Sequence, residues 1–265
     1  MISSKTNQKI KDIVKLIKDN NERKSKGLFV IEGALLAAEA AGSGCILDTV
    51  LFTAAAAERY PLQLAAAVER AGITAEISEA VAGKLSSGRS TQGIFCVVKI
   101  TNKHNLVDIM DKKRVLVLDS ISEPSNLGAM ARSAVAFGFD TLILSEDTSD
   151  WMSPRAQRAA MGALLYMDIV IAPVENAVVK LKENNYYVLA AAIKDGAADM
   201  SEIVPALKTA LVIGNETNGL SAAIIDLCDS PVIIKTDPRI QSLNAAVAAS
   251  ILMCRIDTAG KQSNI

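Results

Sequence analysis

The sequence predicts an α/β protein in which a small N-terminal domain precedes a larger domain with a mostly parallel sheet and helices on both faces. Short apolar runs of strand length alternate with helix-length segments along most of the 265 residues, which favours repeated β-α units. Ala, Val, Leu and Ile supply the packing residues and aromatic residues make up only 4%, as expected where helices cover a parallel sheet. The polar stretch 101–113 separates two such series, so we place one domain at 1–104 and the other at 105–265.

Composition narrows the class of protein. No apolar run is long enough to span a bilayer, and the N-terminus lacks the apolar core of a signal peptide, so we expect a soluble cytoplasmic protein with no membrane partner. The four cysteines are scattered without metal-ligand spacing, and His104 is the only histidine. These patterns argue against a Ser-His-Asp hydrolase, a Cys-His enzyme and a zinc site, and we expect no metal.

In the first domain, apolar runs of strand length lie at 28–31, 46–52, 73–77 and 93–100, and helix-like segments lie at 34–41 and 60–71. Gly72 follows the second helix-like segment and is expected to end it as a C-cap. This alternation predicts a small α/β domain.

Residues 5–26 combine a basic composition with helical periodicity. Ile10, Ile13, Val14 and Ile17 recur at the spacing of one helix face. The basic residues of the segment are Lys5, Lys9, Lys11, Lys15, Lys18, Arg23, Lys24 and Lys26. An ordinary solvated face and a contact with a polyanion explain this cluster equally well; on a chain with net charge −1, local clustering is typical of an RNA or DNA footprint.

In the second domain, strands are expected at 115–118, 141–144, 167–171, 187–192, 210–214 and 231–234, and helices at 127–137, 154–165 and 174–184. Asn126 is expected to cap the first of these helices. Arg132 lies six residues further along, and its guanidinium is suited to a phosphate. From the spacing alone, however, a solvent-facing arginine is the simpler interpretation.

Two polar loops follow the last two predicted strands. The loop after 210–214 carries Gly214, Asn215, Glu216, Asn218 and Gly219, and the loop after 231–234 carries Gln241, Ser242 and Asn244. Ligands of open α/β sheets bind beyond the carboxyl ends of the strands, so these loops predict one shared pocket. Either Ser242 or Asn244 can cap the alanine-rich helix that follows. Glu216 is an acid in an otherwise uncharged loop, which predicts a cationic partner or a ligand.

Two common nucleotide-binding classes are excluded by their missing glycines. The chain has neither a GxGxxG at a strand–helix junction nor a GxxxxGK[ST] sequence. A Rossmann dehydrogenase and a P-loop NTPase are therefore disfavoured, and a nucleotide-dependent oxidoreductase ranks far behind the other interpretations.

Taken in order, the motifs resemble a known family. The sequences SEPSNLGAMAR at 122–132, LVIGNETNGLS at 211–221 and IIKTDPRIQSLN at 233–244 resemble the three motifs of the SpoU/TrmH-type RNA 2′-O-ribose methyltransferases of the SPOUT superfamily. SPRAQRAAMGAL at 153–164 is similar to the segment between the first two motifs. FVIEG at 29–33 and TQGI at 91–94 resemble the family's RNA-binding domain, so the resemblance covers nearly the whole chain.

The resemblance implies a fold, a cofactor and a partner. The second domain is expected to contain a trefoil knot, to bind S-adenosylmethionine in it and to form a homodimer, while the first domain binds RNA. The cofactor site would comprise Gly214, Ile234 and Leu243, with Leu211 and Asn215. The substrate would be ribosomal RNA rather than transfer RNA.

The resemblance also implies roles for five matching residues: Asn126, Arg132, Glu216, Ser242 and Asn244. The family assigns its arginine as general base; because guanidinium stays protonated, we expect Arg132 to bind the RNA phosphate and stabilise the emerging alkoxide. Glu216 would orient an arginine, and Asn126, Ser242 and Asn244 would hold the loops and the ribose. The third motif departs from the family pattern at Lys235, Thr236, Pro238 and Gln241. This altered rim leaves open a second interpretation, a non-catalytic RNA-binding or ribosome-assembly protein with the same fold.

Overall fold

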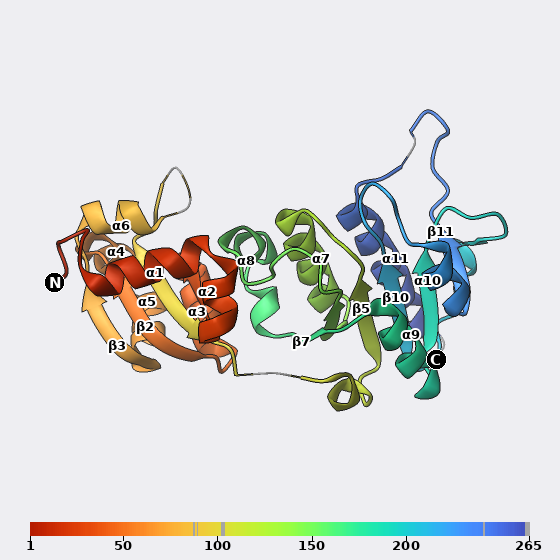
Figure 1. Ribbon diagram of the computed structural model, residues 1–265, viewed down its shortest axis with the longest axis horizontal. Helices are drawn as coiled ribbons and strands as arrows, with labels where there is room; N and C mark the ends of the chain where they lie inside the picture. Colours follow the sequence, from red (N-terminus) through yellow and green to blue (C-terminus); the bar gives the residue numbers. More distant parts are fainter. Residues whose placement is uncertain (87, 89, 102–103, 241, 263–265) are drawn as a thin grey trace. The chain divides into compact units, whose positions relative to one another are not determined.

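The computed structural model describes residues 1–86, 88, 90–101, 104–240 and 242–262 (Figure 1). The chain forms two compact units, Met1–Thr101 with Asp150–Leu165, and Asn102–Ser149 with Tyr166–Ile265. The division into domains at residues 104 and 105 stays a prediction. The compact units differ from it in two respects: the first unit ends at Thr101, and Asp150–Leu165 packs with that unit. Trp151 stacks edge-on against Phe29 at 5.5 Å between ring centroids, and Met152 is buried in the same core.

The first unit is built on a four-stranded sheet among its described residues, with the order β1-β4-β2-β3. The strands are β1 (Leu28–Glu32), β2 (Ile46–Phe52), β3 (Ala71–Glu76) and β4 (Ile94–Lys99), and only β2 and β3 pair in parallel. The helices are α1 (Gln8–Lys18), α2 (Asn20–Lys26), α3 (Ala34–Gly42), α4 (Ala54–Arg59), α5 (Pro61–Glu69), α6 (Glu79–Leu85) and α8 (Pro154–Ala160). Alternate side chains of β1 enter opposite cores: Phe29 and Ile31 pack with α3 and α5, and Val30 packs with α1 and α6.

Three local predictions for this unit were wrong. Gly72 lies inside β3 and is not a C-cap, because α5 ends at Glu69 and Arg70 caps it. The helix α4 was missed; the Thr53 hydroxyl caps it by accepting from Ala56 N. The basic segment 5–26 forms two helices, because Asp19 leaves the helical conformation and accepts hydrogen bonds from the first turn of α2.

The second unit contains a seven-stranded sheet among its described residues, with the order β7-β6-β5-β10-β8-β11-β9 and parallel pairing throughout. The strands are β5 (Arg114–Leu118), β6 (Thr141–Leu144), β7 (Asp168–Ile171), β8 (Tyr187–Ala191), β9 (Ala198–Asp199), β10 (Thr209–Ile213) and β11 (Ser230–Ile233). The helices are α7 (Pro124–Ala136), α9 (Val174–Glu183), α10 (Ala222–Leu227) and α11 (Ala245–Gln262). The predicted α/β class and parallel sheet are confirmed, whereas the two-residue strand β9 was not foreseen. The trefoil knot stays a prediction.

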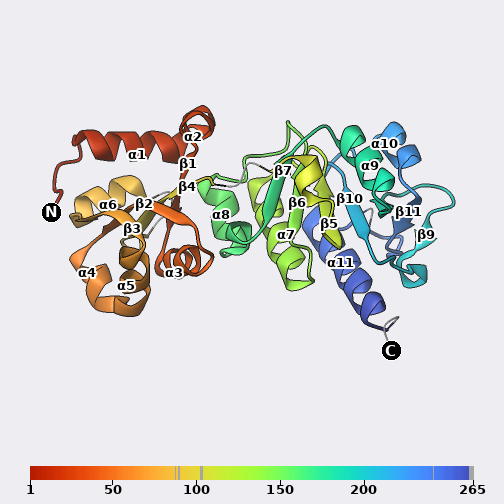
Figure 2. The ribbon, with the colours of Figure 1, turned by 90° about the horizontal axis from the view of Figure 1, so that it is seen from below.

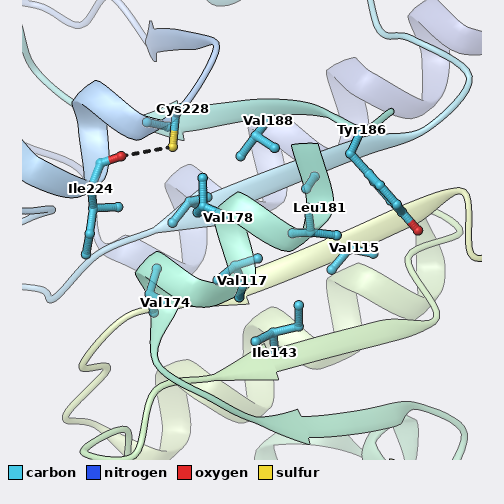
Figure 3. Packing of buried hydrophobic residues seen from close by; sticks show 14 of the residues in the cluster. Val115, Val117, Ile143, Val174, Val178, Leu181, Tyr186, Val188, Ile224 and Cys228 are labelled. Atoms are coloured by element: carbon cyan, nitrogen blue, oxygen red, sulfur yellow. Dashed lines mark hydrogen bonds between the residues drawn. The ribbon is translucent and has the colours of Figure 1, made fainter. Parts of the chain in front are cut away.

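Helices cover both faces of this sheet. Figure 2 shows α9 and α10 on one face and α7 and α11 on the other. Val115 and Val117 of β5 pack under α9 with Val174, Val178 and Leu181 (Figure 3). The alternate residues Leu116 and Leu118 are equally buried, so both faces of β5 are apolar, as in a central parallel strand. Over the described ranges, none of the helices is both long and apolar enough to cross a membrane.

Candidate active site

A cavity of about 600 Å³ lies at the carboxyl ends of β8, β10 and β11, where the two polar loops meet. Its described lining residues are Ala191–Ile193, Ile213–Leu220, Ile225, Val232–Thr236, Ser242, Leu243, Ala245, Ala248 and Leu252. The predicted shared pocket is therefore present, and its position follows the rule for open α/β sheets. Apolar lining residues come from α10, β11 and α11, and polar lining residues come from the two loops.

The loop after β10 folds back on itself and needs a glycine at its start. Asn215 and Gly219 form an isolated bridge, with Gly219 N donating to Asn215 O at 2.9 Å. The Asn215 side chain accepts from Thr217 N at 2.9 Å and from Asn218 N at 3.1 Å. A Cβ atom at Gly214 would lie 2.3 Å from the carbonyl carbon of Gly219. Only glycine lets the returning strand of the loop pass this close to β10.

Glu216 connects this loop to the N-terminus of α7. Its carboxylate accepts from Ser122 N at 3.1 Å, from the Ser122 hydroxyl at 2.8 Å, from Glu123 N at 3.2 Å and from Asn126 Nδ2 at 2.9 Å. Burial raises the pKa of Glu216, but the hydrogen bonds from Asn126, Ser122 and its own backbone outweigh this and lower the pKa to about 2. The prediction was a cationic partner or a ligand; among the described residues the donors that hold the carboxylate are neutral, so the first alternative is not found and the second stays a prediction.

The amide of Asn126 links Glu216 to the third motif. Asn244 Nδ2 donates to Asn126 Oδ1 at 3.1 Å, and Asn244 Oδ1 accepts from Ala246 N at 2.9 Å. Asn244 therefore caps α11, as one of the two predicted alternatives. The prediction that Asn126 caps a helix was wrong: Glu123 caps α7 by accepting from Ser125 N, which leaves the Asn126 amide free to bridge the two loops.

Most of the other residues predicted for the site line the cavity, and Leu211 does not. Gly214, Asn215, Ile234, Ser242 and Leu243 line the cavity, as does Glu216. Leu211 does not, because it lies in the middle of β10 and is completely buried among strands β5 and β8. Gln241 lies outside the described residues.

Arg132 does not line the cavity. It lies on α7 further along the helix than Asn126, with its side chain exposed. Within the described part of the chain, no residue hydrogen-bonds or pairs with its guanidinium. An unpaired arginine is available to a phosphate or a developing negative charge.

Sequence reasoning missed one wall of the cavity. This wall consists of Ala191, the last residue of β8, and of Ala192 and Ile193, which follow it; β8 lies beside β10 in the sheet. They are apolar and carry no motif, so only the strand order could have identified them. Among the described residues, no group of three or more His, Cys, Asp or Glu side chains could hold a metal ion.

Comparison with known proteins agrees with this geometry. Residues 113–254 match the SpoU rRNA Methylase family, and residues 7–96 match the MRM3-like substrate binding domain. The chain is 30% identical over 252 residues to the 23S rRNA (guanosine(2553)-2′-O)-methyltransferase RlmP of Bacillus subtilis, which covers 95% of this chain and 97% of that protein.

Two solved structures have similar folds. One is an AdoMet-bound rRNA methyltransferase from Sinorhizobium meliloti, with a TM-score of 0.87, 26% identity and coverage of 97% of each chain. The other is the SpoU methyltransferase AviRb from Streptomyces viridochromogenes in complex with AdoMet. The match has a TM-score of 0.83 at 23% identity and covers 96% of this chain and 98% of that one. At this identity the similarity establishes a shared fold only.

The parallel sheet, the cavity and the three linked motifs thus define a methyltransferase, and the chain belongs to the SpoU rRNA methylase family. It is an RNA ribose 2′-O-methyltransferase that uses S-adenosylmethionine. The cavity fits this cofactor. Its volume of about 600 Å³ is that of a small-molecule site, apolar residues such as Ile225, Val232 and Leu252 line it, and the two loops add polar residues.

Proposed function

We propose that the protein methylates a ribose 2′-hydroxyl of large-subunit ribosomal RNA. The observation that carries the proposal is the hydrogen-bonded series Glu216–Asn126–Asn244, which joins all three motifs beside the cavity. The name of the Bacillus subtilis relative supports the choice of 23S rRNA. The match of residues 7–96 to a substrate-binding domain supports RNA contact by the first unit.

The chain's own residues would divide the work between binding and orientation. Gly214, Ile234 and Leu243 would hold S-adenosylmethionine, which supplies a methyl group activated by its sulfonium. Asn126 and Asn244 would hold the loops at a fixed separation, and the nearby Arg132 would bind the phosphate of the target nucleotide. Holding an activated methyl group and a hydroxyl in line removes most of the entropic barrier to transfer.

Two ionisable groups are poor proton acceptors here. The Glu216 carboxylate has a pKa of about 2 and already accepts four hydrogen bonds, so its basicity is low. The Arg132 guanidinium is permanently charged. We therefore assign Arg132 an electrostatic role, in which it stabilises the negative charge that develops on the ribose oxygen. Glu216 anchors the loop after β10 to α7.

We also propose a homodimer and a cytoplasmic location. The packed helices α7 and α11 expose Val135 and Val247, which supports an apolar contact with a second copy. The four cysteines are free thiols, which suits a reducing compartment.

Transfer of labelled methyl groups from S-adenosylmethionine to ribosomal RNA tests the proposed activity. We expect incorporation at one ribose, located by mapping alkali-resistant linkages in 23S rRNA. The exposed Lys235 and the neighbouring Pro238 on the altered rim favour a second candidate function, an RNA-binding protein without catalysis. RNA that is bound but never labelled would support that second function.

The basic face of α1 gives a separate prediction for RNA binding. Lys11 and Lys15 of α1 are exposed, as is Lys5 just before the helix, whereas Arg23 belongs to α2 and is buried against Asp150. Replacing Lys5, Lys9 and Lys11 by Gln should weaken RNA binding. Each lost phosphate contact should also lower the slope of log affinity against log salt by about 0.7 to 0.9. Filter binding at several salt concentrations measures both effects.

The exposed Lys113 of the other unit provides a matched control, and Lys113→Gln should leave the salt slope unchanged. A triple variant with the parental slope would mean that α1 presents only a solvated face.

A further inference from the structure

The cavity has an unusual distribution of charge. Among its described lining residues, Glu216 and Lys235 are the charged ones. The Glu216 oxygens are taken up by Ser122, Glu123 and Asn126 of the same chain. Lys235 is therefore the charged lining group with hydrogen-bonding capacity left for a ligand.

The position of Lys235 follows from the register of two short strands. β9 pairs in parallel with β11, and Asp199 lies opposite Ile233. Lys235 follows Ile233 by two residues, so its ammonium can reach the Asp199 carboxylate, and the Nζ–Oδ2 distance is 3.3 Å. β9 thus aligns a cation at the rim of the cavity.

The Asp199 carboxylate is anchored independently of Lys235. Its Oδ1 accepts from Ser201 N at 2.9 Å and from the Ser201 hydroxyl. These bonds, ahead of the contact with Lys235, lower the pKa of Asp199, so the carboxylate is ionised at neutral pH. The Lys235 side chain is 76% exposed, and exposed ion pairs contribute little to stability. The ammonium, on its flexible stem and with three donors, can therefore bind a second anion without breaking the fold.

We propose that Lys235 is a ligand-binding residue that pairs with the amino-acid carboxylate of the methyl donor, an inference that rests on the proposed function. The donor carries one carboxylate, and Lys235 is the cation that the described cavity lining offers to it. This chain would thus bind the amino-acid end of its cofactor through a charged side chain.

Titration calorimetry with two ligands tests this pairing. The ligands are S-adenosylmethionine and its decarboxylated analogue, which keeps the adenosine, the sulfonium and the amine. Lys235→Gln should weaken binding of S-adenosylmethionine about tenfold and leave the affinity for the decarboxylated analogue within about twofold of the parent. Lys235→Arg should restore most of the loss.

Lys194 provides the matched control. It forms a similar exposed ion pair with Asp226 at 2.6 Å but does not line the cavity. Lys194→Gln should bind both ligands like the parent. Equal losses for both ligands in Lys235→Gln, or no loss for either, would overturn the inference. The inference would also be overturned if Lys235→Gln bound S-adenosylmethionine normally but had lost affinity for RNA, because Lys235 would then contact the nucleic acid. A parent protein that gives no heat with S-adenosylmethionine would overturn the proposed function together with this inference.

Discussion

Arg132→Ala should reduce methyl transfer to RNA by roughly 10²–10³-fold while leaving cofactor binding intact. A rate loss of this size is expected when an enzyme loses one preorganised positive group that faces the negative charge developing in the transition state. Cofactor binding should survive because Arg132 lies on α7 outside the cavity lining. Single-turnover transfer of a labelled methyl group measures the first quantity, and calorimetry with S-adenosylmethionine measures the second.

Arg132→Lys distinguishes the effect of the positive charge from the effect of the planar guanidinium geometry. It keeps the positive charge but not the planar fork, so it should recover only part of the lost rate. If Arg132→Ala transferred methyl groups as fast as the parent, Arg132 would have no part in the mechanism.

Gly214→Ala should abolish detectable cofactor binding and lower the thermal unfolding midpoint by several degrees. The new Cβ atom would lie 2.5 Å from both the carbonyl oxygen of Gly219 and the amide nitrogen of Leu220. These are backbone atoms, so relief requires the loop after β10 to move. That movement would also displace Glu216 from α7. Overpacking of this kind costs about 1–3 kcal/mol. Calorimetry and thermal unfolding followed by circular dichroism measure the two effects.

Gly83→Ala is the matched control for this substitution. Gly83 lies inside α6 and has open space where a Cβ would stand. Alanine is favoured over glycine in a helix by about 1 kcal/mol, so this variant should bind the cofactor normally and be at least as stable as the parent. A Gly214→Ala protein that binds S-adenosylmethionine like Gly83→Ala would contradict the role assigned to the returning loop.

The positions of the strands and the two loops could be predicted because they depend on local patterns. The run 141–144 has the sequence Thr-Leu-Ile-Leu, which is mostly apolar, and it becomes β6 with the predicted bounds. The polar residues after 210–214 and 231–234 had to meet, since parallel strands end at one edge of the sheet. The family motifs then identified most of the loop residues that line the cavity.

Other features depend on contacts between distant segments and could not be read locally. Asn126 follows a proline and a serine, which made it a plausible cap; the structure uses Glu123 instead and connects Asn126 to Asn244, 118 residues away. The partners of Glu216 lie 90 to 94 residues upstream. Strand β9 has only two residues, too few for any periodicity, yet it places Asp199 beside Lys235.

The burial of Arg23 in the first unit limits how the chain can be divided. Arg23 is 4% exposed, and its Nε donates to Asp150 Oδ2 at 2.7 Å. The covalent chain therefore leaves the N-terminal unit at residue 101, returns at 150 and leaves again at 165. A fragment that ends at residue 104 would lack Asp150, so the buried Arg23 charge would lose its partner. It would also lack Trp151 and Met152, which pack in the apolar core of this unit. The N-terminal unit is thus not a continuous stretch of the sequence, because its core is completed by residues 150–165, which lie within the segment that matches the SpoU rRNA Methylase family.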